Sequence, residues 1–171
     1  PMALPKKLKD LNLFSNGESW QGIVQSITLP TLTRKIEEWR GGGMDGAVGI
    51  DMGQDGLLTV QWTVGGLVES LFDNFGTARI DADMLRMTGS YERDDIDDAS
   101  SVEVVMRGRH TEIDMGDAQT GENTEHQVTS TLSYYKLTID GTEKIEIDLV
   151  NGVFKVNGVD RLAGRRQRLG I

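Results

Sequence analysis

Only two histidines and no cysteine are available for nucleophilic or metal chemistry in this chain of 171 residues. A catalytic triad needs a nucleophile beside an oriented base, and a structural zinc site needs four nitrogen or sulfur ligands. His110 lies where a predicted strand passes into a loop and His126 lies in a polar run, so we expect both at the surface. The histidines therefore predict neither a hydrolase nor a zinc centre.

Two further clusters resemble ligand-binding motifs but lack the required spacing. The acidic run 92–98 does not have the alternating ligand positions and the distal glutamate of a calcium loop, so we expect a solvated hairpin tip. The three glycines at 41–43 precede neither a Lys-Ser/Thr pair nor a helix start, as a phosphate cradle would require. They favour flexibility or close backbone contact. The sequence predicts no enzyme, no metal and no cofactor.

The carboxylate pair Glu146 and Asp148 lies in the most regular part of the chain, within 133–161. Apolar and charged residues alternate there, with Ile145, Ile147 and Leu149 on one side and Lys144, Glu146 and Asp148 on the other. A period of two predicts a strand with one dry and one wet face. A general acid needs a pKa raised by burial, which an open polar face does not provide. The pair therefore predicts a charged sheet face and no catalytic site.

The elements that would position these residues are mainly strands. Strand patterns cover 20–29, 33–39, 47–52, 57–64, 84–91, 102–110, 127–140, 143–150 and 153–156, and Asp140-Gly141 predicts a tight hairpin. Helical spacing predicts a helix over 67–75, ended by Gly76. A second, short helix is predicted over 159–169, with Asp160 as N-cap and Gly170 as stop.

Two segments, 40–56 and 108–124, are too long for tight hairpin loops. Long loops in a compact domain are usually functional or disordered. Both contain apolar residues among polar ones, including Met44, Ile50 and Met52 in the first and Ile113 and Met115 in the second. That mixture favours docking on another surface over free solvation. We expect one domain over 1–171 carrying these two loops.

Charge is distributed unevenly along the chain. The net charge is −9, yet residues 1–10 carry +2 and residues 161–171 carry +4, which leaves −15 on the stretch between them. This acidic body does not suit a nucleic-acid binder, which needs a basic face to replace phosphate counterions. It suits self-association through basic ends and an acidic body, while acidity that serves only solubility remains an alternative. No segment approaches the roughly 20 apolar residues of a membrane span, so we expect no membrane anchor.

Short motifs in a specific order run along nearly the whole chain. They are Asn12-Leu13-Phe14, Leu29-Pro30, Arg40-Gly41-Gly42-Gly43-Met44-Asp45, Arg107-Gly108-Arg109, Glu112-Ile113-Asp114, Gly116-Asp117, Thr120-Gly121-Glu122, Tyr134-Tyr135-Lys136-Leu137, Glu146-Ile147-Asp148 and Asn157-Gly158-Val159-Asp160-Arg161-Leu162-Ala163. In these motifs the chain resembles the major tail tube protein of contractile-tailed bacteriophages, a family that also supplies the tube of R-type pyocins.

The resemblance implies a mainly β fold with two packed antiparallel sheets forming a barrel-like core, one flanking α-helix and a short C-terminal helix. It implies hexameric rings that stack into a hollow tube, in which strands of six subunits form one inner barrel without open edges. The implied partners are further copies of the chain, the tail sheath, tape-measure, baseplate and tail terminator proteins, and DNA that passes without specific binding. The implied location is the virion tail, after assembly in the bacterial cytoplasm.

The residues and this resemblance together predict three sets of contacts. Glu146 and Asp148 are expected to face the lumen, where an acidic wall would repel DNA over a range of about 8 Å at physiological salt. The ring-stacking loop is expected to include Arg40, Gly41, Gly42, Gly43, Met44, Asp45, Ile50 and Met52. Contacts between subunits are expected at Arg161, Arg165, Arg166 and Arg168.

Other functions remain open at this point. A tail-like bacteriocin without a genome would use the same kind of tube, and a secretion-system tube would have a similar fold. A monomeric β-barrel that binds a small ligand would require a closed apolar pocket and would leave the two long segments without a role.

Overall fold

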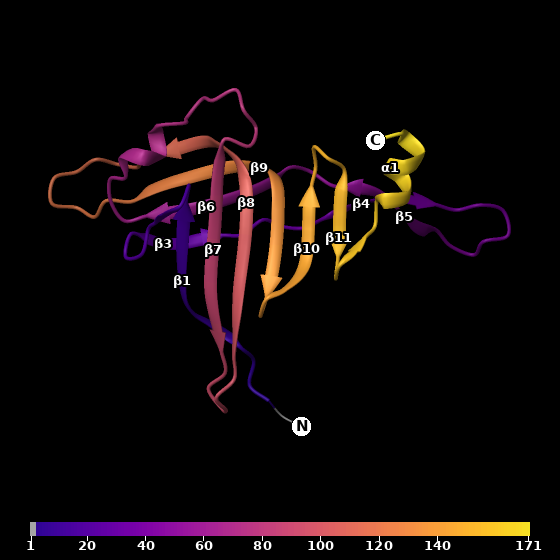
Figure 1. Ribbon diagram of the computed structural model, residues 1–171, viewed down its shortest axis with the longest axis horizontal. Coiled ribbons are helices and arrows are strands. Elements are labelled where there is room, and N and C mark those ends of the chain that lie inside the picture. The colour runs from indigo at the N-terminus through magenta and orange to yellow at the C-terminus, as the bar shows by residue number, and fades with distance from the viewer. Residues whose placement is uncertain (1–2) are drawn as a thin grey trace.

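The computed structural model describes residues 3–171, which form twelve β-strands, one 3-10 turn and one short helix (Figure 1). No helix in this described part is long and apolar enough to cross a membrane. The elements in chain order are β1 (Lys7–Ser15), β2 (Glu18–Ser19), β3 (Val24–Thr28), β4 (Arg34–Trp39), β5 (Val48–Gln54), β6 (Leu58–Val64), η1 (Glu69–Phe72), β7 (Asp83–Glu92), β8 (Ala99–Asp114), β9 (His126–Ile139), β10 (Thr142–Asp148), β11 (Val153–Val156), β12 (Val159–Asp160) and α1 (Ala163–Leu169).

Ten strands form one antiparallel sheet in the order β12-β11-β10-β9-β8-β7-β1-β2, with β6 also on β9 and β3 on β6. The long strand β9 serves two neighbours in turn, because 126–132 pair with β6 and 134–139 pair with β10. The sheet therefore bends along β8 and β9, and its two parts enclose the core. It does not close on itself, so the predicted barrel-like closure is not found within residues 3–171.

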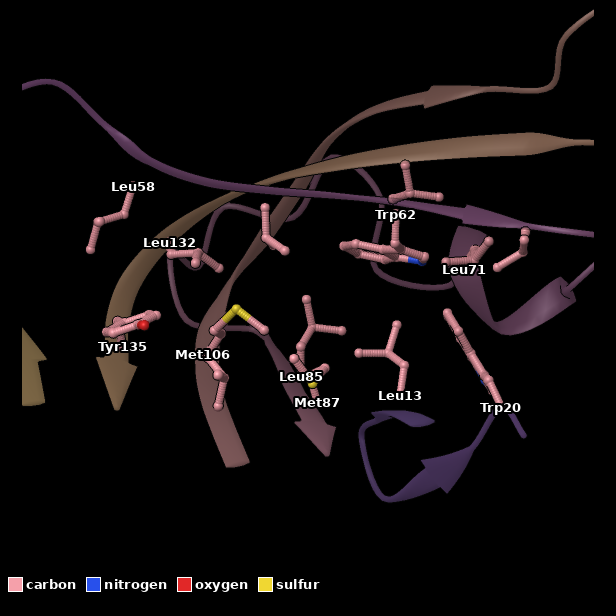
Figure 2. Close-up of a cluster of buried hydrophobic side chains, with 14 of the residues drawn as sticks. Leu13, Trp20, Leu58, Trp62, Leu71, Leu85, Met87, Met106, Leu132 and Tyr135 are labelled. Atoms are coloured by element: carbon pink, nitrogen blue, oxygen red, sulfur yellow. The ribbon is translucent and has the colours of Figure 1, made fainter. Parts of the chain in front are cut away.

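The core is made by residues that alternate along these strands. In β6, Leu58, Val60, Trp62 and Val64 are all buried, as a period of two requires for a strand with one dry face. They meet side chains from β1, β7, β8 and β9 in the same cluster, including Leu13, Leu85, Met87, Met106 and Leu132 (Figure 2). Trp20 joins from the β2–β3 connection, with its ring centroid 6.3 Å from that of Trp62.

The predicted helix over 67–75 does not form. Only the 3-10 turn η1 is present, and Val68 and Leu71 alone in this region are buried, while Leu67, Phe72 and Phe75 remain exposed. The Asn74 side chain donates a hydrogen bond to Asp83 at 3.1 Å, which draws the chain back toward β7 after a single turn. The apolar spacing is helical, but only two of these apolar residues reach the core, so the segment has no continuous apolar stripe that a helix would bury.

Both predicted long loops are shorter than expected. Residues 48–54 of the first form β5, which pairs with β4 in a separate two-stranded hairpin, hereafter the arm (residues 34–54). Residues 108–114 of the second belong to β8, so only 115–125 connect β8 to β9. The acidic run lies at the β7–β8 hairpin tip, as predicted. In Figure 1 the arm and the β8–β9 connection extend toward opposite ends of the molecule.

The C-terminal helix begins later than predicted, because 159–160 form β12 instead. Asp160 does not cap the helix as predicted; its carboxylate accepts a hydrogen bond from the Leu162 amide at 3.0 Å and pairs with Arg166. Gly170 ends the helix in the left-handed conformation, with φ of 77°, as predicted.

Candidate assembly surfaces

The bent sheet leaves one broad face uncovered, on the side of β1 and β7–β12 opposite to the core, hereafter the open face. Strand register aligns its side chains in rows that cross the sheet. The middle row consists of Phe14, Arg86, Val105, Lys136, Glu146, Lys155 and Asp160. The row on one side of it consists of Met84, Arg107, Tyr134, Asp148 and Val153. The row on the other side consists of Asn12, Thr88, Glu103, Thr138 and Glu143.

The predicted lumen residues Glu146 and Asp148 both lie on this face, and both already have partners in the chain. Glu146 accepts a hydrogen bond from the Tyr134 hydroxyl at 2.6 Å and lies 3.6 Å from the Lys155 ammonium. Burial, followed by this hydrogen bond to Glu146, raises the pKa of Tyr134. Asp148 accepts two hydrogen bonds from Asn151 and so fixes the β10–β11 turn.

The open face also carries basic side chains, which the sequence did not predict. Arg86 pairs with Glu103 at 3.1 Å, and Arg107 stacks over the Tyr134 ring at 4.9 Å. Together with Lys136 and Lys155, these arginines face five carboxylates in the three rows, so the charges nearly balance. Each strand alone shows its alternation, but the neighbouring charges become visible only when the register is known.

The arm carries the residues that were predicted to form the ring-stacking loop, and it exposes an apolar face. Register places Trp39 opposite Val48 and Glu37 opposite Ile50, so Trp39, Val48 and Ile50 share a face with Met52. These four apolar side chains are 58%, 49%, 43% and 55% exposed. An isolated hairpin is marginally stable in water, so an apolar arm of this kind requires a covering surface.

The glycine-rich tip of the arm folds back on itself. Among the predicted stacking residues there, Gly41, Gly42, Gly43 and Asp45 surround Met44, whose carbonyl accepts a hydrogen bond from Arg40 at 3.2 Å. A Cβ on Gly41 would contact both the Trp39 ring and the Met44 sulfur at 3.5–3.6 Å. These are ordinary van der Waals distances to side chains, and a Cβ on Gly42 or Gly43 would meet nothing within 4 Å. Close backbone contact, one of the two explanations predicted for these glycines, is therefore not found, whereas the positive φ of Gly43, 82°, favours a glycine there.

The four C-terminal arginines divide into one internal clamp and three exposed cations. Arg166 donates to the Gly152 carbonyl at 2.8 Å and pairs with Asp160, holding the pKa of Asp160 at about 2. The side chains of Arg161, Arg165 and Arg168 form no ion pair within residues 3–171. Arg166 therefore positions α1, and the other three are available to a partner.

Both histidines are buried, contrary to the prediction. His110 Nδ1 lies 2.7 Å from Ser130 Oγ, and His110 Nε2 lies 3.7 Å from Asp83, which also accepts hydrogen bonds from Asn16 and Asn74. The three side chains of His110, Ser130 and Asp83 are 4%, 1% and 2% exposed, so no substrate reaches them despite the triad-like set. His110 continues the even-numbered buried phase of Val104 and Met106, a signal that could have predicted its burial. No group of acidic and histidine side chains in the described chain is arranged to hold a metal.

Comparison with known proteins agrees with this architecture. The chain is 46% identical to the tail tube protein of Escherichia phage P2 over 99% of its own length and 100% of that protein. It is 44% identical to the major tail tube protein of Serratia phage KSP20 over 92% of its length and 91% of that protein.

Solved structures with much lower identity share the fold. A chain of the extended sheath/tube terminator of an extracellular contractile injection system matches 76% of this chain and 94% of its own length, with a TM-score of 0.58 and 7% identity. A chain of the extended sheath-tube complex matches 75% of this chain and 87% of its own, with a TM-score of 0.55 and 9% identity. Residues 5–170 match the family described as phage tail tube protein FII. The chain therefore belongs to the phage tail tube protein FII family and is a structural subunit of a contractile phage tail.

Proposed function

We propose that copies of this subunit join into hexameric rings and that the arm of each copy packs against the adjacent ring, so that the rings stack into a hollow tube. The observation that carries the proposal is the apolar face of the arm. Trp39, Val48, Ile50 and Met52 are half-exposed in the single chain and lie on one side of a hairpin with no layer over it. Burying such surface stabilises an assembly by about 25 cal/mol per Å² before the costs of association.

The ends of the large sheet support closure into rings. The terminal strands β2 and β12 are two residues long, so the outer edges of β1 and β11 are only partly paired, while their inner edges pair with β7 and β10. Unpaired strand edges are templates for another strand, and a closed ring of subunits would satisfy them. The barrel absent from one chain would then form from several chains.

In this arrangement the open face lines the channel, with Glu146 and Asp148 among its residues. Its carboxylates are interleaved with Arg86, Arg107 and Lys155, which gives a nearly neutral wall in place of the strongly acidic one expected earlier. Without an excess of cations, the wall offers phosphates little counterion release, so DNA would pass without being held. A tape-measure protein would occupy the same channel during assembly.

The outer surface would meet the sheath, and the ends of the tube would meet baseplate and terminator proteins. Support comes from the assemblies in which the related folds occur, which are a sheath-tube complex, a sheath/tube terminator and the baseplate of the anti-feeding prophage. The last of these has a TM-score of 0.51 at 12% identity and covers 81% of this chain.

Negative-stain electron microscopy and sedimentation of the purified protein test the proposal. We expect the wild type to form rings or tubes. The double variant Trp39→Ser/Ile50→Ser should fold, but its assembly should be reduced at least about tenfold, which corresponds to about 1.4 kcal/mol. Ile96→Ser, at the exposed β7–β8 tip, is the matched control and should assemble normally. A wild type that stays a compact monomer at all concentrations would refute the proposal, and normal tubes from the double variant would exclude the arm.

A further inference from the structure

A basic groove lies beside the C-terminal helix, at the same end of the molecule as the arm. This groove, hereafter the arginine groove, has a volume of about 430 Å³, and its lining includes Arg34, Asp51, Phe154, Arg161 and Arg165. Arg34 pairs with Asp51 at 3.0 Å and stacks over the Phe154 ring at 4.6 Å.

Arg34, followed by the Gly53 amide and with a smaller effect of Arg165, lowers the pKa of Asp51. The lining contains three guanidinium groups and one carboxylate, which is paired with Arg34, so the groove carries a charge of +2. Arg161 and Arg165 are exposed there without an ion-pair partner in the described chain. An uncompensated pair of arginines on an otherwise structured wall favours an anionic occupant.

The segment formed by Asp114, the last residue of β8, and the β8–β9 loop has the opposite character. Residues 114–125 contain four carboxylates and no lysine or arginine, namely Asp114, Asp117, Glu122 and Glu125. All four line one hollow of about 460 Å³, and none forms an ion pair within residues 3–171. Exposed Met115 adds an apolar contact surface at the base of the loop. This segment, hereafter the acidic loop, is the chemical complement of the arginine groove.

The two complementary surfaces cannot meet within one copy. The acidic loop extends at one end of the long axis of the molecule, whereas α1 and the arm lie toward the other end (Figure 1). A contact that joins unlike ends of identical copies is heterologous, and repeating it closes a ring where the rotation from copy to copy closes and otherwise generates an open filament. Placement and charge together select a second copy of this chain as the occupant of the groove.

We infer that the acidic loop of one subunit docks in the arginine groove of a neighbouring subunit in the tube. The inference rests on the proposed tube assembly and adds to it a specific pair of surfaces. The apolar arm supplies buried area, and the ionic pair supplies direction and register, because only head-to-tail copies bring the loop to the groove. Arg166 acts indirectly by holding α1 in the wall of the groove.

Charge reversal with rescue tests this contact. Asp117→Lys/Glu122→Lys and Arg161→Glu/Arg165→Glu should each reduce tube formation about tenfold or more, and the quadruple variant should restore it to within about threefold of wild type. Asp94→Lys/Asp97→Lys at the β7–β8 tip makes the same change in net charge and should assemble normally. Wild-type tube formation should weaken from 50 mM to 1 M NaCl, where the screening length falls to about 3 Å.

A charge-neutral cross-link supplies an independent test. The chain has no cysteine, so Asn123→Cys/Leu169→Cys places one thiol in the acidic loop and one beside the groove without removing any charge. Oxidation of assembled protein should give a ladder of dimers, trimers and longer chains, since disulfides form only when the Cα atoms approach within about 7 Å. Ile96→Cys/Leu169→Cys is the control and should remain monomeric on a denaturing gel.

The outcomes separate this inference from the proposed function. If the wild type forms tubes but both one-sided variants assemble like the control and no ladder appears, the loop–groove contact is overturned and the tube stands. If the quadruple variant stays defective and Arg161→Glu/Arg165→Glu loses binding to a 20-nucleotide DNA probe, the groove serves nucleic acid and the inference fails. If the wild type forms no ring or tube, the proposed function itself fails.

Discussion

Replacing Gly108 by alanine should weaken the fold at the point where the sheet bends. A Cβ at this position would stand 2.1 Å from the Thr131 carbonyl oxygen and 2.9 Å from the Leu132 Cα. Both are backbone atoms of β9, so no flexible side chain can move aside. The conflict is steric, because Gly108 does not have a positive φ.

The size of the effect follows from these distances. An ordinary contact of a Cβ atom is 3.4 Å or more, so β8 and β9 would have to separate by about 1 Å at the bulge between Arg107 and Gly108. Overpacking of this kind costs about 1–3 kcal/mol, and weakened ladder hydrogen bonds add about 1 kcal/mol each. We expect a loss of about 3 kcal/mol, a large part of the 5–15 kcal/mol typical of a domain. The unfolding temperature should fall by about 6–12 °C.

Urea unfolding of the unassembled subunit, followed by tryptophan fluorescence, measures this loss because Trp20 and Trp62 are both buried. Gly46→Ala is the matched control, since a Cβ there meets nothing within 4 Å and its φ is not positive. The control should change the free energy of unfolding by less than about 0.5 kcal/mol. Equal stability of the two variants would show that β8 and β9 do not approach as closely as described, and the account of the bend would be wrong.

Two further predictions concern buried and terminal contacts. Burial lowers the pKa of His110 below its usual value of about 6.5, so the folded state resists protonation, and the free energy of unfolding should fall as the pH drops below about 6.5. The slope should reach up to about 1.4 kcal/mol per pH unit and should be lost in His110→Gln. A wild-type unfolding midpoint that is flat between pH 7.5 and pH 5 would contradict this prediction. Arg166→Ala should speed amide hydrogen exchange over 163–169 and leave the global unfolding midpoint nearly unchanged. The reason is that α1 buries no residue and is held by the contacts of Arg166 with Gly152 and Asp160. Arg165→Ala is the control with unaltered exchange, and the same result for Arg166→Ala would exclude the clamp.

Alternation along the chain predicted most of the strands, because burial on one face leaves a period of two in the sequence. The buried residues of β6, and Ile147 in β10, follow that period as expected. The strand β1 was missed because a bulge between Leu8 and Asp10 shifts its register against β7. Leu8 and the later apolar residues Leu11 and Leu13 are therefore out of phase in the sequence although they belong to one strand.

Other features depend on contacts between distant residues and leave no local signal. The segment 67–75 has helical spacing, but only Val68 and Leu71 are buried, and the Asn74 side chain bonds to the distant Asp83. The face that carries Glu146 could be predicted from its own strand, whereas its pairing with Tyr134 and Lys155 depends on two strand registers. Cross-strand partners of this kind require the three-dimensional structure.

The placement of charge changes what the acidity of this chain implies. The sequence suggested an acidic wall along the sheet, yet the carboxylates of the open face alternate with arginines and lysines. The acidic excess lies largely outside that face, at the β7–β8 tip (residues 92–98) and in the acidic loop, where five and four carboxylates occur. Three of the tip carboxylates pair with Lys6, Lys9 and Arg93 of the same chain, whereas the acidic loop has no such partners within residues 3–171 and is the site that we infer to meet a neighbouring copy. The net charge of this subunit therefore bears more on how copies meet than on what passes through the tube.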